Sequence, residues 1–218
     1  MKSNKQRGFT LVEIAIVLVI VGLLIGGVLK GQEMITNAKL KRIESDNAGL
    51  AAAMFSYQDR YLQLPGDDTQ ADSRFSIYTD GTNDPTTAEI TGDGSGTVDG
   101  AWKGDPTVAS PNHETAIFWK HLRAAGLIPG DGDDATQPTN AYGGLIGIQN
   151  GALGISGHVT VFGAIEGPIA RILEARLDDG QPDSGRMQAD ESGSDMTATS
   201  STSTSYDDTK RYDIAFRL

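Results

Sequence analysis

The sequence contains no cysteine, and this absence removes one class of chemistry and one kind of structural support. Without a thiol there is no cysteine nucleophile, and no disulfide bond can fix a long loop. An exported domain of this composition needs another device to order its loops. Glycine, by contrast, accounts for 27 of 218 residues, which indicates a loop-rich globular part.

Basic residues and histidines are scarce. The 18 Lys and Arg residues against 29 Asp and Glu give a formal charge of −11, which argues against nucleic-acid binding because that function needs basic surface. His113, His121 and His158 lack zinc-site spacing, and no HExxH occurs. Residues 154–158 (GISGH) do not form a G-x-S-x-G elbow, and the glycines at 92–96 have no Walker lysine. We therefore expect no enzyme activity.

Charge is almost absent from the stretch that begins GFTLVEIAIVLVIVGLLIGG at Gly8. Between Phe9 and Leu29, Glu13 is the one ionisable side chain. As a helix this segment is roughly 31 Å long, enough to cross a bilayer core. About fifteen Leu, Ile, Val and Phe residues contribute roughly −7 kcal/mol to insertion, against at most about +3.5 kcal/mol for a central glutamate. Insertion into a membrane is therefore favoured.

The short leader MKSNKQRG is basic, ends in Gly8 and is followed by Phe9, with Glu13 in the apolar run beyond. A carboxylate in a spanning segment is costly and marks a candidate functional site. These residues resemble the type IV prepilin signal, the class III signal peptide. An ordinary secretory signal is cut beyond its apolar run and lost, whereas the resemblance implies cleavage between Gly8 and Phe9, before the run. A generic signal anchor with a chance glutamate is the alternative interpretation.

The resemblance implies a pilin, minor pilin or pseudopilin, a structural subunit of a type IV pilus or of the type II secretion pseudopilus. It implies cleavage after Gly8 by prepilin peptidase, N-methylation of the new N-terminal Phe9, and pairing of Glu13 with the N-terminus of a neighbouring subunit. The implied partners are other subunits, the peptidase, an inner-membrane assembly platform and the membrane itself. Many type IV pilins close a C-terminal loop with a disulfide, and this chain departs from that pattern.

The charge distribution predicts the topology. Loss of Lys2, Lys5 and Arg7 with the leader changes the formal charge from −11 to −14. A basic segment before the span and an acidic bulk after it place the N-terminus in the cytoplasm and the C-terminal domain in the periplasm. The expected location is the bacterial inner membrane and then a filament that can reach the cell surface. A membrane-tethered periplasmic binding or sensing domain that does not polymerise is the competing function.

The helix is expected to continue beyond the membrane as an amphipathic segment over residues 30–64, because no proline occurs before Pro65. Leu64-Pro65-Gly66 is expected to end it. The chain then divides into a leader (1–8), a transmembrane or filament-core helix (9–29), its amphipathic continuation (30–64) and a globular pilin-like domain (65–218). The predicted core-facing stripe of the continuation alternates in steps of three and four: Leu40, Ile43, Asn47, Leu50, Met54, Tyr57, Tyr61 and Leu64.

Residues 65–218 predict a small sheet with long loops. A helix is expected to begin at Ser110-Pro111 and end near Gly126, and a second to cover 168–180. The alternation at 144–150, 158–165 and 211–218 is typical of strands, and 185–189 is a further candidate. The polar run 189–209 is interpreted as a mobile loop. The predicted fold is α+β and pilin-like: a long N-terminal helix packed on a small C-terminal antiparallel sheet.

One loop has the composition of a cation site. Oxygen-bearing side chains recur in a glycine-rich stretch at Asp93, Ser95, Thr97 and Asp99, a pattern that suits calcium. It departs from the EF-hand, which has more carboxylates and a glutamate at its twelfth position. Some pseudopilins use calcium to order a disulfide-free loop region, so no cofactor is required but calcium is a candidate. Ordinary Asp-Gly turns are the alternative. Additional or alternative ligands are Asp67, Asp68, Asp131, Asp133 and Asp134.

Overall fold

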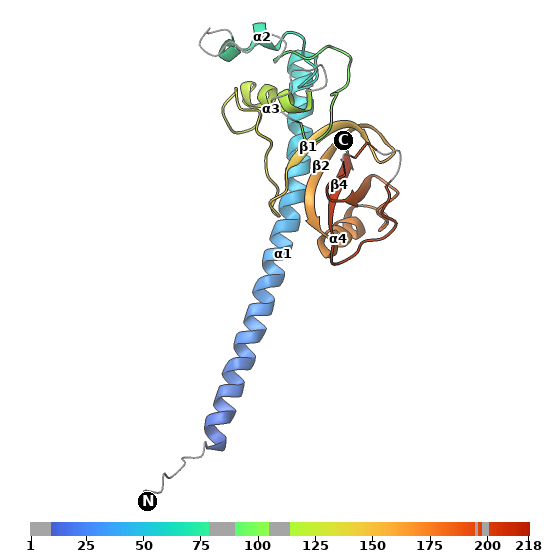
Figure 1. The fold of residues 1–218 in the computed structure, drawn as a ribbon. Helices are drawn as coiled ribbons and strands as arrows, with labels where there is room; N and C mark the ends of the chain where they lie inside the picture. Colours follow the sequence, from blue (N-terminus) through green and yellow to red (C-terminus); the bar gives the residue numbers. More distant parts are fainter. Residues whose placement is uncertain (1–9, 79–89, 105–113, 195, 198–200) are drawn as a thin grey trace, which may run out of the picture. The chain divides into compact units, whose positions relative to one another are not determined.

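The computed structural model describes residues 10–78, 90–104, 114–194, 196–197 and 201–218. It divides into two compact units, Met1–Lys41 and Arg42–Leu218, which are described separately. The expected helix start at Ser110-Pro111 lies outside the described residues. The first unit consists of the first part of helix α1, and the second contains the sheet and the remaining helices (Figure 1).

Helix α1 is a single element, Leu11–Tyr61. It contains no proline, and its first part is rich in leucine, isoleucine and valine. The helix ends at Tyr61, earlier than the Leu64 boundary that the sequence predicted, because Leu62 adopts a left-handed conformation with φ of 56°. A left-handed residue directly after the last turn is a common helix terminator, and Pro65 prevents the helix from resuming.

Most of the stripe predicted for the amphipathic part of α1 is buried in the second unit, with Asn47 and Tyr61 partly exposed. Ile43 and Tyr57 have no exposed surface, and Leu50 and Met54 are also buried. Asn47, the polar member of the stripe, accepts a hydrogen bond from the hydroxyl of Thr160 in the sheet. The period of the apolar residues therefore identified the face of the helix that packs on the domain.

Four strands form one antiparallel sheet in the order β1-β2-β4-β3 (Figure 1). The predicted α+β fold, with a long N-terminal helix and a small antiparallel sheet, is confirmed. The register shifts between Phe162 and Ile165 of β2, where Ala164 has a positive φ of 57°. The strands cover β1 Ile146–Ala152, β2 Ile155–Glu166, β3 Met187–Glu191 and β4 Arg211–Arg217.

Trp102 anchors the loop before the sheet against its first two strands. The indole is buried, and the strands approach it where they carry glycine. A Cβ atom at Gly163 would lie 2.7 Å from the Trp102 ring, and one at Gly147 would meet the Trp102 backbone carbonyl. These two glycines are therefore needed for close packing rather than for a turn.

In the described part of the second unit, three shorter α-helices and one 3-10 turn accompany the sheet. The helix predicted before Gly126 is α3, Glu114–Ala124, and the amide of Leu127 donates to the carbonyl of Leu122 across Gly126, a Schellman-type ending. The helix predicted at 168–180 is α4, Gly167–Leu177, which opens with a proline in its first turn. The connection after α1 contains the short helix α2, Ala71–Arg74, and the 3-10 turn η1, Ser76–Tyr78.

The polar run predicted as a mobile loop, 189–209, begins inside strand β3, which extends to Glu191, and its described residues after the strand bond back to that strand. The Ser201 hydroxyl donates to the carbonyl of Ala189, and the Thr202 hydroxyl donates to Asp190. Ser201, Ser203 and Tyr206 are buried. Short polar side chains attach this segment to the edge of the strand by hydrogen bonds. Its composition alone did not indicate these bonds.

His121 fastens the chain that follows α1 to helix α3. Its Nδ1 accepts a hydrogen bond from the Gly66 amide at 2.9 Å, and its Nε2 lies 2.6 Å from the carbonyl of Ile90. The ring is therefore the neutral tautomer with the proton on Nε2. Burial lowers the pKa of His121 to about 4, so the native protein keeps it neutral under most conditions.

We predict that His121→Leu lowers the free energy of unfolding by about 2 kcal/mol or more, since it leaves two buried backbone groups without partners. The deficit is expected to shrink as the pH falls from 7 towards 4. In that range the unfolded wild-type chain protonates His121 while the folded chain does not, so the histidine's contribution is lost on the acid side. Denaturant unfolding of both proteins across this pH range measures the difference, and a constant deficit would contradict the prediction.

Candidate functional site

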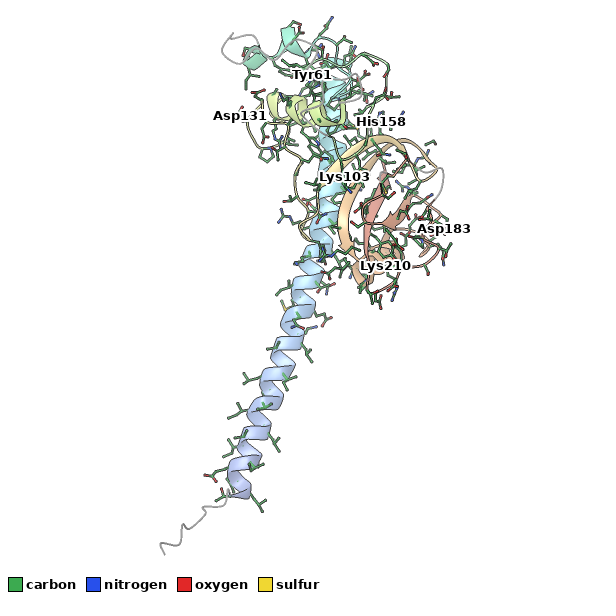
Figure 2. The ribbon with its side chains drawn as sticks, in the orientation of Figure 1. Tyr61, Lys103, Asp131, His158, Asp183 and Lys210 are labelled. Atoms are coloured by element: carbon green, nitrogen blue, oxygen red, sulfur yellow. The ribbon has the colours of Figure 1, made fainter. Side chains whose placement is uncertain are left out.

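The first candidate site is the apolar part of α1, here called the stem, residues 11–29. Its side chains point outward around the helix (Figure 2), and its large hydrophobic residues are exposed, Leu11 by 90% and Leu23 by 73%. By length and composition α1 is the one helix among the described residues that is able to span a membrane. Such a surface is not stable in water and needs lipid or other helices around it.

Thr10 and Glu13 form a reciprocal cap at the start of the stem. The Thr10 amide and hydroxyl both donate to Oε2 of Glu13, at 2.8 and 2.7 Å, and the Glu13 amide donates to the Thr10 hydroxyl at 3.3 Å. This is a capping box, which satisfies amides that the first turn of a helix leaves without partners. The cap holds the Glu13 carboxylate at the helix N-terminus and leaves it exposed.

Thr10 was not among the residues predicted from sequence. Its signal is present as the Thr-x-x-Glu pattern directly before an apolar run, which is a recognised sign of a helix start. The predicted cleavage residues Gly8 and Phe9 lie outside the described residues. Their roles, and that of Glu13 in subunit pairing, stay predictions.

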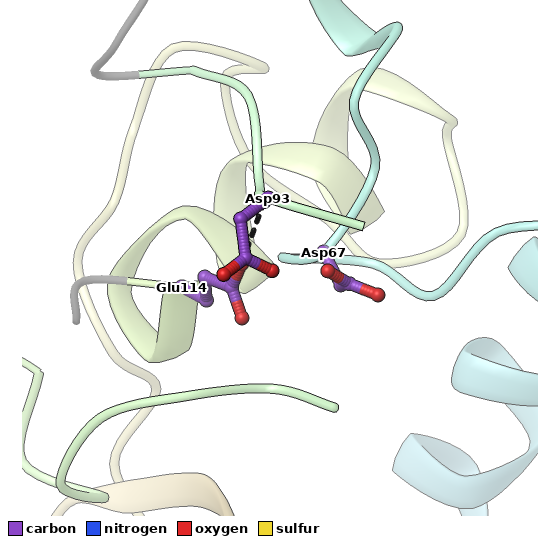
Figure 3. A group of neighbouring side chains, drawn as sticks. All are labelled: Asp67, Asp93 and Glu114. Carbon is purple, nitrogen blue, oxygen red and sulfur yellow. Dashed lines mark hydrogen bonds between the residues drawn. The ribbon is translucent and has the colours of Figure 1, made fainter. Parts of the chain in front are cut away.

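The second candidate site is an acidic cluster beside the glycine-rich loop at 92–99, formed by Asp67, Asp93 and Glu114 (Figure 3). One carboxylate oxygen from each residue lies within 4.8 Å of the others. Asp67 and Glu114 are buried, whereas Asp93 is exposed. Asp67 follows the end of α1 and Glu114 begins α3, so the fold brings three separate segments together here.

Backbone amides of the loop bind the two buried carboxylates. The amides of Ser95 and Gly96 donate to the two oxygens of Asp67, at 2.9 and 2.8 Å. The amides of Asp93 and Asp99 donate to the two oxygens of Glu114, at 3.0 and 2.8 Å. Gly92 passes so close to the Asp67 backbone that a Cβ atom there would collide with it. The loop is thus folded around two buried carboxyl groups.

Burial of Glu114 raises its pKa to about 7, and the nearby Asp67 and Asp93 carboxylates act in the same direction. The amides of Asp99 and Asp93 oppose this rise. Burial also raises the pKa of Asp67. The cluster therefore gathers more negative charge than it compensates, and a proton or a cation would relieve it.

The residues predicted to bind calcium separate into two groups. Asp93 and Asp67 belong to the cluster. The hydroxyls of Ser95 and Thr97 instead bond to each other at 3.0 Å, and Thr97 donates to Asp99 at 2.8 Å. The remaining candidates lie elsewhere and mostly pair with cations or donors: Asp68 with Arg74 and Tyr57, Asp133 with Lys120, and Asp134 with Arg123, while Asp131 accepts the Asp133 amide. Calcium at this loop stays a prediction.

The described histidines serve as hydrogen-bond partners of the backbone. His121 joins Gly66 to Ile90, and Nε2 of His158 accepts the amide of Val98 at 3.1 Å. His158 thereby ties the glycine-rich loop to strand β2. Burial lowers the pKa of His158, which favours the neutral ring that can accept this bond.

A cavity of about 410 Å³ lies in the second unit between the second half of α1, helix α3 and the start of β1. Leu50, Trp119, Leu127 and Ile146 give it an apolar wall, and Arg42 lies at its lining. The indole Nε1 of Trp119 is buried without a hydrogen-bond partner. The cavity has the size of a small-molecule site.

We predict that Asp67→Asn lowers the free energy of unfolding by about 1–3 kcal/mol, because the amide that replaces one oxygen faces a backbone N–H donor. The loss is expected to be equal in calcium and in chelator, since the partners of Asp67 are backbone amides. Thermal melting of wild type and variant in both buffers is the measurement. A loss seen only in calcium would instead support the predicted calcium site in this loop.

The prokaryotic N-terminal methylation motif matches residues 3–29. No curated protein and no solved structure matches the chain. The matched segment contains residues 3–8 of the basic leader, Phe9 and the capped Glu13, together with the stem. The motif implies processing by prepilin peptidase and assembly with other pilin subunits, and with the apolar helix it fits inner-membrane anchoring. The chain therefore carries a prokaryotic N-terminal methylation motif, which is consistent with a class III prepilin signal protein and supports a type IV pilin-like or pseudopilin protein.

Proposed function

We propose that this protein is a structural subunit of a type IV pilus or of a type II secretion pseudopilus. In this proposal the chain is cleaved between Gly8 and Phe9, methylated on Phe9 and assembled through its stem. The methylation motif over residues 3–29 is the observation that carries the proposal. The family of this motif is structural rather than enzymatic, and the protein is a substrate of the processing enzyme.

The exposed stem supports assembly. Each large hydrophobic side chain moved out of water contributes about 1.5–3 kcal/mol, so the stem is stable in lipid before assembly and against neighbouring stems afterwards. Glu13 adds an electrostatic requirement to this packing. The capping box gives its carboxylate polar partners but no positive charge, and in a helical bundle a lone charge is strongly penalised unless an opposite charge meets it. The amine of a cleaved Phe9 on a neighbouring copy supplies one.

The basic leader supports a cytoplasmic N-terminus and a periplasmic domain, since Lys2, Lys5 and Arg7 precede the stem. The absence of cysteine and the acidic charge favour a pseudopilin or minor subunit over a major pilin. High abundance in filaments sheared from the cell surface would favour the major pilin instead.

The alternative is a tethered periplasmic binding or sensing domain that never polymerises. The cavity of about 410 Å³ beside Trp119 is the observation that favours it. Both functions include an anchored stem, so insertion does not separate them. They differ in whether the charge of Glu13 is needed after insertion.

We predict that the native protein begins at Phe9 and carries one N-terminal methyl group. Intact-mass and N-terminal peptide mass spectrometry of protein isolated from its own membrane tests this. A chain that still begins at Met1, or one that begins beyond Leu29, would refute processing at the prepilin site.

We predict that Glu13→Gln and Glu13→Ala both insert into the membrane and both fail to assemble. Glutamine keeps an oxygen that can complete the capping box with Thr10 but removes the charge, whereas alanine removes both. Glu33→Gln is the matched control, because Glu33 is an exposed acid on the same helix that pairs with Lys30 at 2.8 Å. The readout is the fraction of protein recovered in sheared, sedimentable filaments.

The pair of variants separates charge from capping. Assembly by Glu13→Gln but not by Glu13→Ala would show that only the cap matters and would refute charge pairing. Normal behaviour of both variants would favour the tethered domain.

A further inference from the structure

Residues 204–209, here called the pre-β4 loop, contain one buried side chain. Tyr206 is 8% exposed, whereas the other residues of the loop are exposed. The Tyr206 ring packs edge-on against that of Tyr212 with centroids 5.0 Å apart, and its hydroxyl donates to Oε2 of Glu174 at 2.8 Å. The loop therefore stays on the domain only while the interior accommodates the Tyr206 side chain.

Glu174, which accepts the Tyr206 hydroxyl, lies where a negative charge is unfavourable. Its side chain has no exposed surface, and its Oε1 has no hydrogen-bond partner. One of its carboxylate oxygens lies within 4.8 Å of an oxygen of Asp178 and an oxygen of Asp179. An ionised Glu174 would therefore be a buried charge beside two other acids, with one oxygen left unsolvated. The neutral carboxyl group avoids this cost.

The arginines of α4 are engaged with other acids. Arg171 pairs with Asp208, and Arg176 pairs with Glu44 of α1. Strands β2, β3 and β4 also pack against α4, and the ion pairs at their ends are closed among themselves: Glu166 with Arg211, and Glu191 with Lys210. Among the described contacts, the charged groups that act on Glu174 are the acids Asp178 and Asp179.

We propose that Glu174 and Tyr206 form a pH-sensitive latch on the pre-β4 loop. The neutral carboxyl group of Glu174 holds the Tyr206 hydroxyl in the interior, and its ionisation expels Tyr206 and releases residues 204–209. Flanking contacts limit the released stretch, because the Ser203 hydroxyl donates to Asp190 on β3 and the Gly167 amide donates to the carbonyl of Lys210. The proposal goes beyond filament assembly and does not depend on it.

The pH range of the latch follows from the two environments of Glu174. Burial raises its pKa from 4.5 to about 8 in the closed state, and Asp178 and Asp179 act in the same direction, while the Tyr206 hydroxyl opposes the rise. Burial also raises the pKa of Tyr206, so its hydroxyl remains a donor. Water restores an ordinary pKa to Glu174 once the loop leaves. The closed state is therefore most stable below pH 4.5, loses stability as the pH rises and reaches its minimum above pH 8.

The test is amide hydrogen exchange of the full-length protein in detergent, followed by mass spectrometry of peptides that contain residues 204–209, from about pH 5 to about pH 9. Measured rates are divided by the intrinsic exchange rate at each pH. We expect the opening constant of the wild-type loop to rise about tenfold per pH unit up to pH 8 and then to level off. Glu174→Gln is expected to stay closed at every pH, because glutamine keeps an oxygen for the Tyr206 hydroxyl and cannot ionise.

Two further variants separate the latch from a general effect of charge. Glu166→Gln removes an exposed acid at the start of α4 and is expected to behave as the wild type does. Asp179→Asn keeps an oxygen for the Gln181 amide but removes a charge that raises the pKa of Glu174, so the rise is expected to level off at a lower pH.

Three outcomes would overturn the proposal. The first is a wild-type loop whose protection does not change with pH. The second is a Glu174→Gln loop that keeps the wild-type pH dependence or is open at every pH. The third is opening of peptides from α1 and β2 in parallel with the loop, since the whole unit rather than the loop would then be responding to pH.

Discussion

The stem dominates the physical chemistry of this protein, because its apolar surface has no cover within residues 11–29 themselves. Lipid removes the hydrophobic penalty but makes the single carboxylate at Glu13 more costly. The capping box with Thr10 lowers that cost by supplying donors from the same turn. It leaves the negative charge in place, so the stem is stable in a membrane yet still gains from a positive partner.

The second unit depends on buried carboxylates that organise loops. Asp213 in strand β4 accepts bonds from the amides of Ala164 and Gly193 and from the Ser192 hydroxyl. Asp67 and Glu114 accept loop amides in the same way. A carboxylate with several N–H donors fixes the direction of several backbone segments at once. In a chain without cysteine, these contacts hold the long loops in place, which is the role that a disulfide has in other proteins.

Patterns that depend on local period were predictable from sequence. The stem, the buried stripe through Ile43 and Tyr57, and the strands with β-branched residues all follow from which residues alternate or recur along one element. The end of α1 was placed too late because the left-handed conformation of Leu62 has no marker in a leucine. The described part of the segment after β3 was mistaken for a mobile loop because its serines bond to a strand that is adjacent only in the fold.

The candidate sites likewise divide into residues that local sequence patterns identify and residues that only the folded structure brings together. Glu13 was found from its position in an apolar run, and Thr10 was recoverable from the capping pattern. Glu114 and Glu174 were not singled out, because each lies in an ordinary amphipathic helix and acquires its environment from distant segments. Asp131, Asp133 and Asp134 were the alternative ligands in sequence, and α3 supplies Lys120 and Arg123 to two of them. Composition identified acidic loops but did not identify which acids have cationic neighbours.

The two buried glutamates, Glu114 and Glu174, show how the same residue type reaches different outcomes. Around Glu114, backbone amides occupy both carboxylate oxygens, so the charge is solvated by the protein even though its pKa is raised to about 7. The backbone dipoles therefore stabilise the Glu114 carboxylate only in part, because its pKa stays above the usual value. Oε2 of Glu174 accepts a hydrogen bond from the Tyr206 hydroxyl, whereas Oε1 has no hydrogen-bond partner. Burial raises the pKa of Glu174 to about 8, so this side chain compensates its charge by holding a proton near neutral pH.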